Sequence, residues 1–243
     1  MTAYSNGMSH HAIVTGGSRG IGYAIAKSIV MDGGRVAITG RDRDRVNQAV
    51  ETLGAAAGDR GRVAGSAVDV RDRSAVERLV ATTVAQFGQL DTLVNNAGVG
   101  AFASVASMTD DDWARVIDTN LTGVFYCTRA ALQEIKKAGG GWIINIASLA
   151  GRNYFPNGAA YCASKAGLIA FSEALMQEVR YDNIRVSVVM PGSVATEFSH
   201  PVESDDAWKL TPDDIAEVVT DLLRHPGRSL PSKVEIRPSR PKK

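Results

Sequence analysis

The chain has 243 residues, of which 44% are hydrophobic and 22% charged, and this predicts one large α/β domain with a substantial core. Its 27 basic residues are dispersed among 26 acidic ones, and the net charge of +1 argues against a nucleic-acid or membrane-surface partner. The apolar runs are too short to span a bilayer and the polar N-terminus lacks a signal-peptide core, so we expect a cytoplasmic protein.

The two ends of the chain and the cysteines add little chemistry. Cys127 and Cys162 fall within predicted helices, which favours buried free thiols, and the four histidines show no metal-ligand spacing with them, so we expect no metal site. Residues 1–9 are predicted to be a disordered lead-in, and the basic, proline-broken tail 238–243 a solvated end. One domain is expected over residues 10–237, including an irregular substrate loop at 192–208.

A glycine-rich turn follows the first predicted strand. The apolar run 11–15 leads into Gly16-Gly-Ser-Arg-Gly-Ile-Gly22, after which residues 23–31 have helical periodicity. The glycines would let the backbone approach a pyrophosphate, and the helix N-terminus offers unpaired N–H groups. An ordinary tight turn is the alternative, but the order of strand, turn and helix favours a dinucleotide site.

Arginine rather than an acid follows the second predicted strand, 35–39. An acid there would accept a hydrogen bond from the adenosine 2′-hydroxyl, whereas an arginine complements a 2′-phosphate. We therefore expect Arg41, together with Arg19 of the glycine turn, to bind that phosphate, which favours NADP(H) over NAD(H). The rival interpretation is that both arginines are solvated or paired with Asp42 and Asp44.

The middle of the chain continues the alternation of helices and strands. Helix 43–53, strand 63–68, helix 75–87 and strand 90–94 predict a parallel sheet with helices on both faces and a crevice at the strands' C-terminal ends. Asp69 would either accept from the adenine amine or cap the next helix, beginning near Arg71. In the run Asn95-Asn96-Ala97-Gly98, the amides would tie neighbouring strands together and the glycine would leave room for a flat ligand.

Three polar side chains stand out among the apolar elements of the second half. Asn120 interrupts an apolar stretch of a long helix predicted over 110–137, either as a buried structural amide or in a proton path. Ser148 ends the apolar strand 142–147. Tyr161 and Lys165 lie four residues apart, and hence on one face, in a helix over 158–180 whose first half has no other charge.

An adjacent ammonium can lower the pKa of a phenol by roughly one to three units, which would let Tyr161 exchange a proton near neutral pH. The alternative is a surface helix on which Tyr161 and Lys165 are neighbours by chance.

Taken together, these residues resemble the classical short-chain dehydrogenase/reductase family, particularly its 3-oxoacyl-acyl-carrier-protein reductases. The matching motifs, over about residues 11–200, are Thr15-Gly16-x3-Gly20-x-Gly22, Asn95-Asn96-Ala97-Gly98, Asn120, Ser148, Tyr161-x3-Lys165 and Pro191-Gly192. The resemblance implies a single doubly wound Rossmann domain with a seven-stranded parallel sheet.

It also implies roles for four residues. Tyr161 would be the general acid/base, Ser148 would orient the substrate oxygen, and Asn120 would hold a water in a proton relay to Lys165. Lys165 would bind the nicotinamide ribose and lower the pKa of the phenol.

The resemblance completes the expected binding residues. The set for the cofactor is Gly16, Ser18, Arg19, Gly20, Ile21, Gly22, Arg41, Asp69, Val70, Asn96, Ala97, Gly98, Tyr161, Lys165, Pro191, Gly192, Val194 and Thr196. The expected substrate pocket also includes Leu149, Ala150, Asn153, Tyr154, Phe155 and the loop 193–208. Oxoacyl reductases usually carry a glycine-rich segment after the last strand, 232–236, where this chain has Arg237-Pro-Ser-Arg-Pro241, so the substrate stays open.

We therefore expect an NADP(H)-dependent oxidoreductase that interconverts a carbonyl and an alcohol, a 3-oxoacyl- or ketone-type reductase. The alternatives are an NADP-dependent dehydrogenase of a hydroxy acid, sugar or polyol, and a non-catalytic dinucleotide-binding sensor. The apolar surfaces of helices 110–137 and 158–180 exceed what one sheet face needs to cover, which predicts a homotetramer or homodimer.

Overall fold

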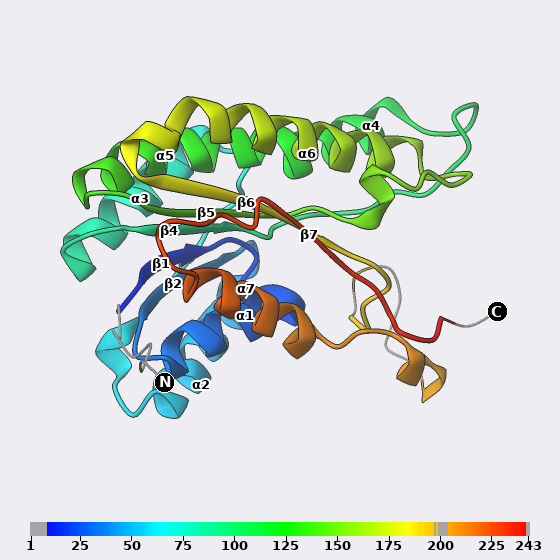
Figure 1. Ribbon diagram of the computed structural model, residues 1–243. Coiled ribbons are helices and arrows are strands. Elements are labelled where there is room, and N and C mark those ends of the chain that lie inside the picture. Colours follow the sequence, from blue (N-terminus) through cyan, green and yellow to red (C-terminus); the bar gives the residue numbers. More distant parts are fainter. Residues whose placement is uncertain (1–8, 197, 199–203, 242–243) are drawn as a thin grey trace.

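One parallel sheet with helices on both faces forms the molecule (Figure 1). The computed structural model describes residues 9–196, 198 and 204–241, so most of the predicted lead-in and parts of the substrate loop and tail lie outside the described residues. The seven strands run in the order β3-β2-β1-β4-β5-β6-β7. Their bounds are β1 His11–Val14, β2 Arg35–Gly40, β3 Val63–Ala67, β4 Thr92–Asn95, β5 Gly141–Ile146, β6 Ile184–Pro191 and β7 Lys233–Ile236.

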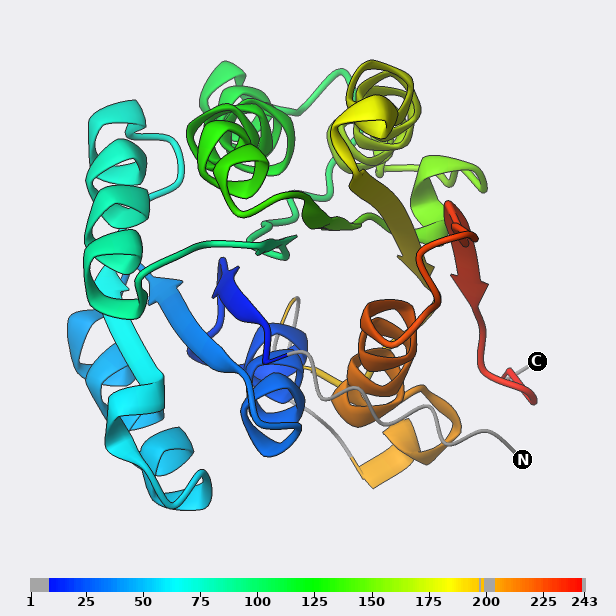
Figure 2. The same ribbon diagram turned by 60° about the vertical axis from the view of Figure 1, so that its left-hand side comes forward.

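The helices form a layer on each side of this sheet (Figure 2). One layer contains α1 Gly20–Met31, α2 Arg43–Ala56 and α7 Pro212–Leu223, and the other contains α3 Arg73–Phe87, α4 Asp110–Ile117, α5 Gly123–Lys137 and α6 Ala159–Val179. Each layer buries its own apolar cluster against the sheet. The single doubly wound α/β domain predicted from the alternating pattern is confirmed.

The strand order reverses beside β1, which pairs with β2 on one side and with β4 on the other. The chain builds outward from β1 to β3, then crosses the sheet and builds from β4 to β7 in the opposite direction. The loops that leave β1 and β4 therefore diverge at the C-terminal edge of the sheet, and a crevice opens between them.

The helix predicted over 110–137 contains a π-helical turn, Asp118–Thr122, between α4 and α5. Asn120 lies in this turn, and its fully buried side chain bonds to the main chain of the loop after β4. The amide thus gains partners outside the helix where the regular pattern is interrupted. The polar run Asp118-Thr119-Asn120 marks this place in the sequence, but apolar periodicity does not distinguish a π-helical turn from a regular helical one.

Both cysteines are buried free thiols, as predicted, and burial raises the pKa of Cys127 to about 12. Among the described residues, the helices are either too short or too polar for a bilayer-spanning segment.

Candidate active site

A cavity of about 1220 Å³ lies at the C-terminal edge of the sheet, lined by the segments that follow all seven strands. Pockets for a single small ligand commonly measure roughly 300–1,000 Å³, so this one has room for a cofactor and a substrate. Of the residues predicted to bind the cofactor, every one except Gly22 lines the cavity. Of the four predicted catalytic residues, Ser148, Tyr161 and Lys165 line it.

The glycine turn between β1 and α1 forms a cradle that side chains would fill. Gly16 has a φ of +64°, and a Cβ there would lie 3.0 Å from the Cα of Ala97. A Cβ at Gly22 would lie 2.4 Å from Asn96 Nδ2, so Gly22 packs behind the turn rather than against the cavity. Helix α1 begins at Gly20 with no side-chain cap. Its first N–H groups are therefore open to an anion, and the turn fits the pyrophosphate of a dinucleotide.

Asn96 fixes this turn to the next loop. Its Nδ2 donates to the carbonyl oxygens of Thr15 at 2.9 Å and Gly16 at 3.2 Å. The preceding Asn95 donates to Asn145 Oδ1 at 2.8 Å, which ties β4 to β5 as predicted. The two adjacent amides thus hold the glycine turn and two central strands in one arrangement.

The end of the cavity formed by the loops after β1, β2 and β3, where the adenosine is expected, carries the predicted arginines. Arg41 and Arg19 both line it. Asp42 caps α2 by accepting from two main-chain N–H groups and pairs with Arg45 rather than Arg41, whereas both Arg19 and Arg41 are exposed, as the solvated form of the rival interpretation has it. Both arginines therefore border the volume where a 2′-phosphate would lie.

Asp69 lines the cavity but does not cap α3. That helix begins at Arg73 with Asp72 as its cap, so the predicted capping role of Asp69 is wrong. The Asp69 carboxylate instead accepts from the guanidinium of Arg71 at 2.6 Å, and this hydrogen bond lowers its pKa. A carboxylate that stays ionised faces the adenosine end and can accept a hydrogen bond there.

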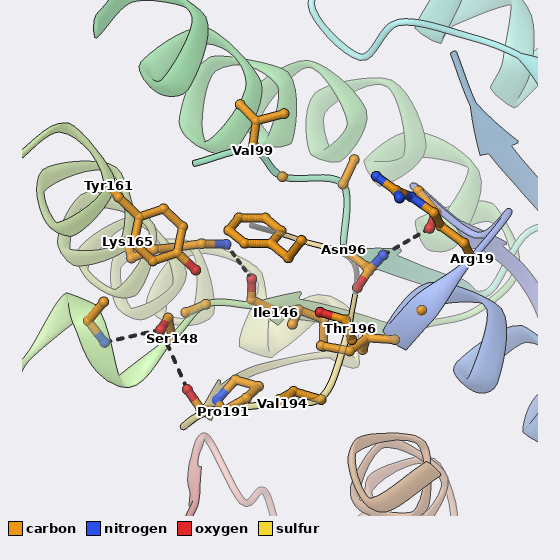
Figure 3. A pocket seen from close by; sticks show the side chains of 18 of the residues that line it. Arg19, Asn96, Val99, Ile146, Ser148, Tyr161, Lys165, Pro191, Val194 and Thr196 are labelled. Carbon is orange, nitrogen blue, oxygen red and sulfur yellow. Dashed lines mark hydrogen bonds between the residues drawn. The ribbon is translucent and has the colours of Figure 1, made fainter. Parts of the chain in front are cut away.

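Ser148, Tyr161 and Lys165 project into one part of the cavity, although they come from the end of β5 and from α6 (Figure 3). Ser148 follows β5, accepts from Ala150 N at 3.1 Å and donates to Pro191 O at 3.5 Å. Burial raises the pKa of the Tyr161 phenol, and a hydrogen bond with Ser148 opposes that rise. The predicted convergence of the two hydroxyls is thus present in the structure.

Lys165 is buried, with a relative exposure of 5%, and its Nζ donates to Ile146 O at 2.8 Å. Its Nζ lies 5.8 Å from the centre of the Tyr161 ring. Burial lowers the pKa of Lys165 to about 8. The phenol pKa was predicted to fall beside this ammonium, but its net shift is upward, because removal from water outweighs the other influences.

Asn120 lies behind the cavity wall. Its Oδ1 accepts from Val99 N at 2.8 Å, and its Nδ2 donates to Val99 O at 2.9 Å and to Ser164 Oγ at 3.0 Å. These bonds connect the π-helical turn to the loop after β4 and to α6. Asn120 is thus a buried structural amide, as one of the two sequence interpretations had it, and its place in a proton path stays a prediction.

Among the aromatic residues of the lining, Phe102 was not predicted from the sequence, whereas Phe198 and Trp208 lie in the loop 193–208 that was expected to border the pocket. Phe102, Phe198 and Trp208 bring aromatic side chains to the cavity, and the ring centres of Phe102 and Phe198 each lie 5.7 Å from that of Tyr161. Arg237, Pro238 and Pro241 also line it, so the C-terminal segment is not simply a solvated end. Tyr154, predicted in the pocket, is 71% exposed and lies outside the lining.

Comparisons with known proteins bear on the family of the chain. The sequence profile of the family described as short chain dehydrogenase matches residues 10–207. A 3-oxoacyl-[acyl-carrier-protein] reductase of Chlamydia muridarum is 38% identical over 188 residues, which cover 77% of this chain and 75% of that protein.

Two solved structures resemble the whole chain. An alcohol dehydrogenase from Thermococcus sibiricus, complexed with 5-hydroxy-NADP, superposes with a TM-score of 0.87 at 30% identity, covering 96% of this chain and 98% of that one. A metagenomic short-chain oxidoreductase in complex with NADP gives 0.83 at 36% identity, covering 98% and 100%. Profile, sequence relatives and fold agree with the motifs in the cavity, and the chain belongs to the short-chain dehydrogenase/reductase family.

Proposed function

We propose that this protein is an NADP(H)-dependent oxidoreductase that interconverts a carbonyl and an alcohol, with Tyr161 as the general acid and base. The observation that carries the proposal is the meeting of Ser148, Tyr161 and Lys165 in a cavity whose far end is a glycine cradle. A dinucleotide sensor would need the cradle alone, so the two hydroxyls and the buried amine favour catalysis.

The cofactor is proposed to be NADP(H) rather than NAD(H). Arg41 and Arg19 border the adenosine end, where two guanidinium groups suit the double charge of a 2′-phosphate. The solved relatives described above contain NADP and 5-hydroxy-NADP. The α1 N-terminus would receive the pyrophosphate, and the loop from Pro191 to Thr196 would border the nicotinamide.

In the proposed reaction, Ser148 and Tyr161 hold the substrate oxygen between their hydroxyls. When bound, the nicotinamide exchanges a hydride with the substrate carbon. In reduction, Tyr161 gives its proton to the oxygen, so the carbonyl gains one hydride and one proton and becomes an alcohol; in oxidation the phenolate takes the proton. Lys165, held by Ile146 O, would bind the nicotinamide ribose and offset the phenolate charge.

Asn120 would hold a water that returns the proton to the site. A Cβ built on Gly98 would lie 3.3 Å from Asn120 Oδ1 and 3.7 Å from Lys165 Nζ. Both polar groups thus border one small space beside Gly98, and a water there would connect them.

A panel of ketones, quinones and 3-oxoacyl thioesters tests the activity through the loss of NADPH absorbance. The proposal expects at least one class to be reduced, with NADPH used in preference to NADH. Tight NADPH binding together with no oxidation across the panel, in either reaction direction, would overturn it in favour of the sensor.

The protein is further proposed to form a homodimer or homotetramer through its α4, α5 and α6 layer. Trp113 on α4 is 45% exposed and Phe125 on α5 is 41% exposed. Two such exposed aromatic side chains give this helix layer an apolar surface that a second subunit would cover. Light scattering at micromolar concentration tests this, and a monomeric mass would contradict it.

A further inference from the structure

Two phenylalanine rings form an apolar wall beside the Tyr161 phenol. Phe102, from the loop after β4, lies edge-on to the Tyr161 ring with 5.7 Å between ring centres. Phe155, from the loop after β5, lies 6.1 Å from Phe102. Both rings line the cavity, and they remain 47% and 43% exposed. Aromatic surface left uncovered inside a concave site gains most from an apolar ligand.

Two glycines hold these rings in position. A Cβ at Gly100 would lie 2.8 Å from the Phe102 ring, and a Cβ at Gly158 would lie 2.5 Å from the Phe155 ring. Neither glycine has a positive φ, so their backbone conformations suit other residues as well. The lack of a side chain at both positions therefore serves the close packing of the two rings, which keeps them beside Tyr161.

The charged groups near this wall already have partners. Lys209 pairs with Asp206, and Arg237 pairs with Glu235 at 2.9 Å. Among the described lining residues, the carboxylates, Asp42 and Asp69, belong to the adenosine end. The substrate end thus offers flat apolar surface, and the charged side chains Lys209 and Arg237 of its described lining are paired.

From this wall we infer that the substrate is a flat, uncharged aryl ketone, selected by Phe102 and Phe155. The inference rests on the proposed function, since it names the substrate class of the same site. A carbonyl attached to an aromatic ring places that ring against the wall when its oxygen lies between Ser148 and Tyr161. Stacked or edge-to-face ring pairs add affinity beyond the burial of area, and a saturated ring of equal size forfeits this gain.

A matched pair of probes separates aromatic recognition from simple burial. 2-Acetylnaphthalene and its saturated counterpart, 2-acetyldecalin, carry the same methyl ketone on two fused rings. We expect wild-type KM, and Kd by calorimetry with NADP⁺ present, to be at least about threefold lower for the naphthyl ketone. Phe102→Leu keeps apolar volume but removes the ring, and should raise both values for the naphthyl ketone about two- to tenfold. Its values for the decalin ketone should stay within about twofold.

Tyr181→Leu is the control variant, because Tyr181 is 93% exposed and lies outside the cavity lining. It should leave both ketones unaffected. Suppose that Phe102→Leu raises KM and Kd equally for the two ketones, or for neither, while Tyr161→Phe still abolishes their reduction. The aryl-ketone inference is then wrong and the proposed function stands. A lower KM for a 3-oxoacyl thioester than for the naphthyl ketone would likewise overturn the aryl-ketone inference and leave the proposed function standing. If NADPH is not oxidised with any ketone, the proposed function fails, and equal calorimetric Kd values for the two probes would then refute the aryl wall separately.

Discussion

The ammonium of Lys165 donates to the main-chain oxygen of Ile146 at 2.8 Å, at the end of the central strand β5. This bond anchors the amine beside Tyr161, with Nζ 5.8 Å from the ring centre. The amine is buried, and burial lowers its pKa to about 8. Lys165 thus releases its proton more readily than an exposed lysine, in a position that borders the reacting groups.

This shift makes stability depend on pH in a predictable direction. The pKa of Lys165 is about 8 in the folded protein against 10.5 for an unperturbed lysine, so between these pH values the unfolded chain binds more protons and stability rises with pH. Below pH 8 Lys165 is protonated in both the folded and the unfolded protein, and the folded protein bears the full free-energy cost of burying that charge. Relative to Lys165→Met, the wild type should therefore gain about 3 kcal/mol in unfolding free energy from pH 8 to 10.5.

Urea unfolding of both proteins across this range measures the difference, in which the titration of all other groups cancels. The loss of the bond to Ile146 O adds a constant that does not vary with pH. A difference that stays level, or that moves against the wild type as pH rises, would contradict a depressed pKa at Lys165.

Asn120 is expected to be a major stabilising residue of the site. Asn120→Ala removes both partners of the Val99 main chain, and each buried polar group left unpaired costs roughly 1–3 kcal/mol. The unfolding free energy should therefore fall by about 2–4 kcal/mol in urea titrations. Asn47→Ala, on the exposed face of α2, is the control and should cost less than about 0.5 kcal/mol. If the two variants are equally stable, Asn120 does not stabilise the protein through its bonds to the Val99 main chain.

Arg41 is expected to decide between the two nicotinamide dinucleotides. Arg41→Glu replaces the phosphate partner with a group that accepts from a 2′-hydroxyl, so the Kd for NADPH should rise at least about tenfold while that for NADH rises little or falls. Arg43→Glu adds the same charge two residues away, outside the cavity lining, and should change the NADPH-to-NADH ratio less than about twofold. Fluorescence titration with both dinucleotides measures the ratio, and an unchanged ratio in Arg41→Glu would remove Arg41 from the phosphate site.

The fold could be predicted from the sequence because its signals are local. Alternation of short apolar strands with periodic helices gave the parallel sheet, and the glycine turn between β1 and α1 marked the edge where the cavity opens. The four-residue spacing of Tyr161 and Lys165 placed both on one face of α6, and each lines the cavity as expected.

The features that the sequence did not predict depend on contacts between segments that lie far apart in the chain. The π-helical turn at Asn120 follows from bonds to Val99, which lies in another loop. Phe102 reaches Tyr161 only because the loop after β4 folds back over α6, and no local pattern specifies that path. The upward shift of the Tyr161 pKa likewise comes from burial by several loops, whereas sequence reasoning considered only its neighbour Lys165.

The Tyr161 phenol is proposed to transfer the proton of the substrate oxygen. Tyr161→Phe keeps the ring that packs on Phe102 and removes only the hydroxyl, so the fold and the dinucleotide site should persist. The decisive measurement is kcat/KM for the best ketone of the panel beside the Kd for NADPH, in Tyr161→Phe and wild type. We expect Tyr161→Phe to lose about 10²-fold or more in kcat/KM, with its Kd for NADPH within about twofold of the wild-type value. Reduction by Tyr161→Phe at the wild-type rate would contradict this proposal.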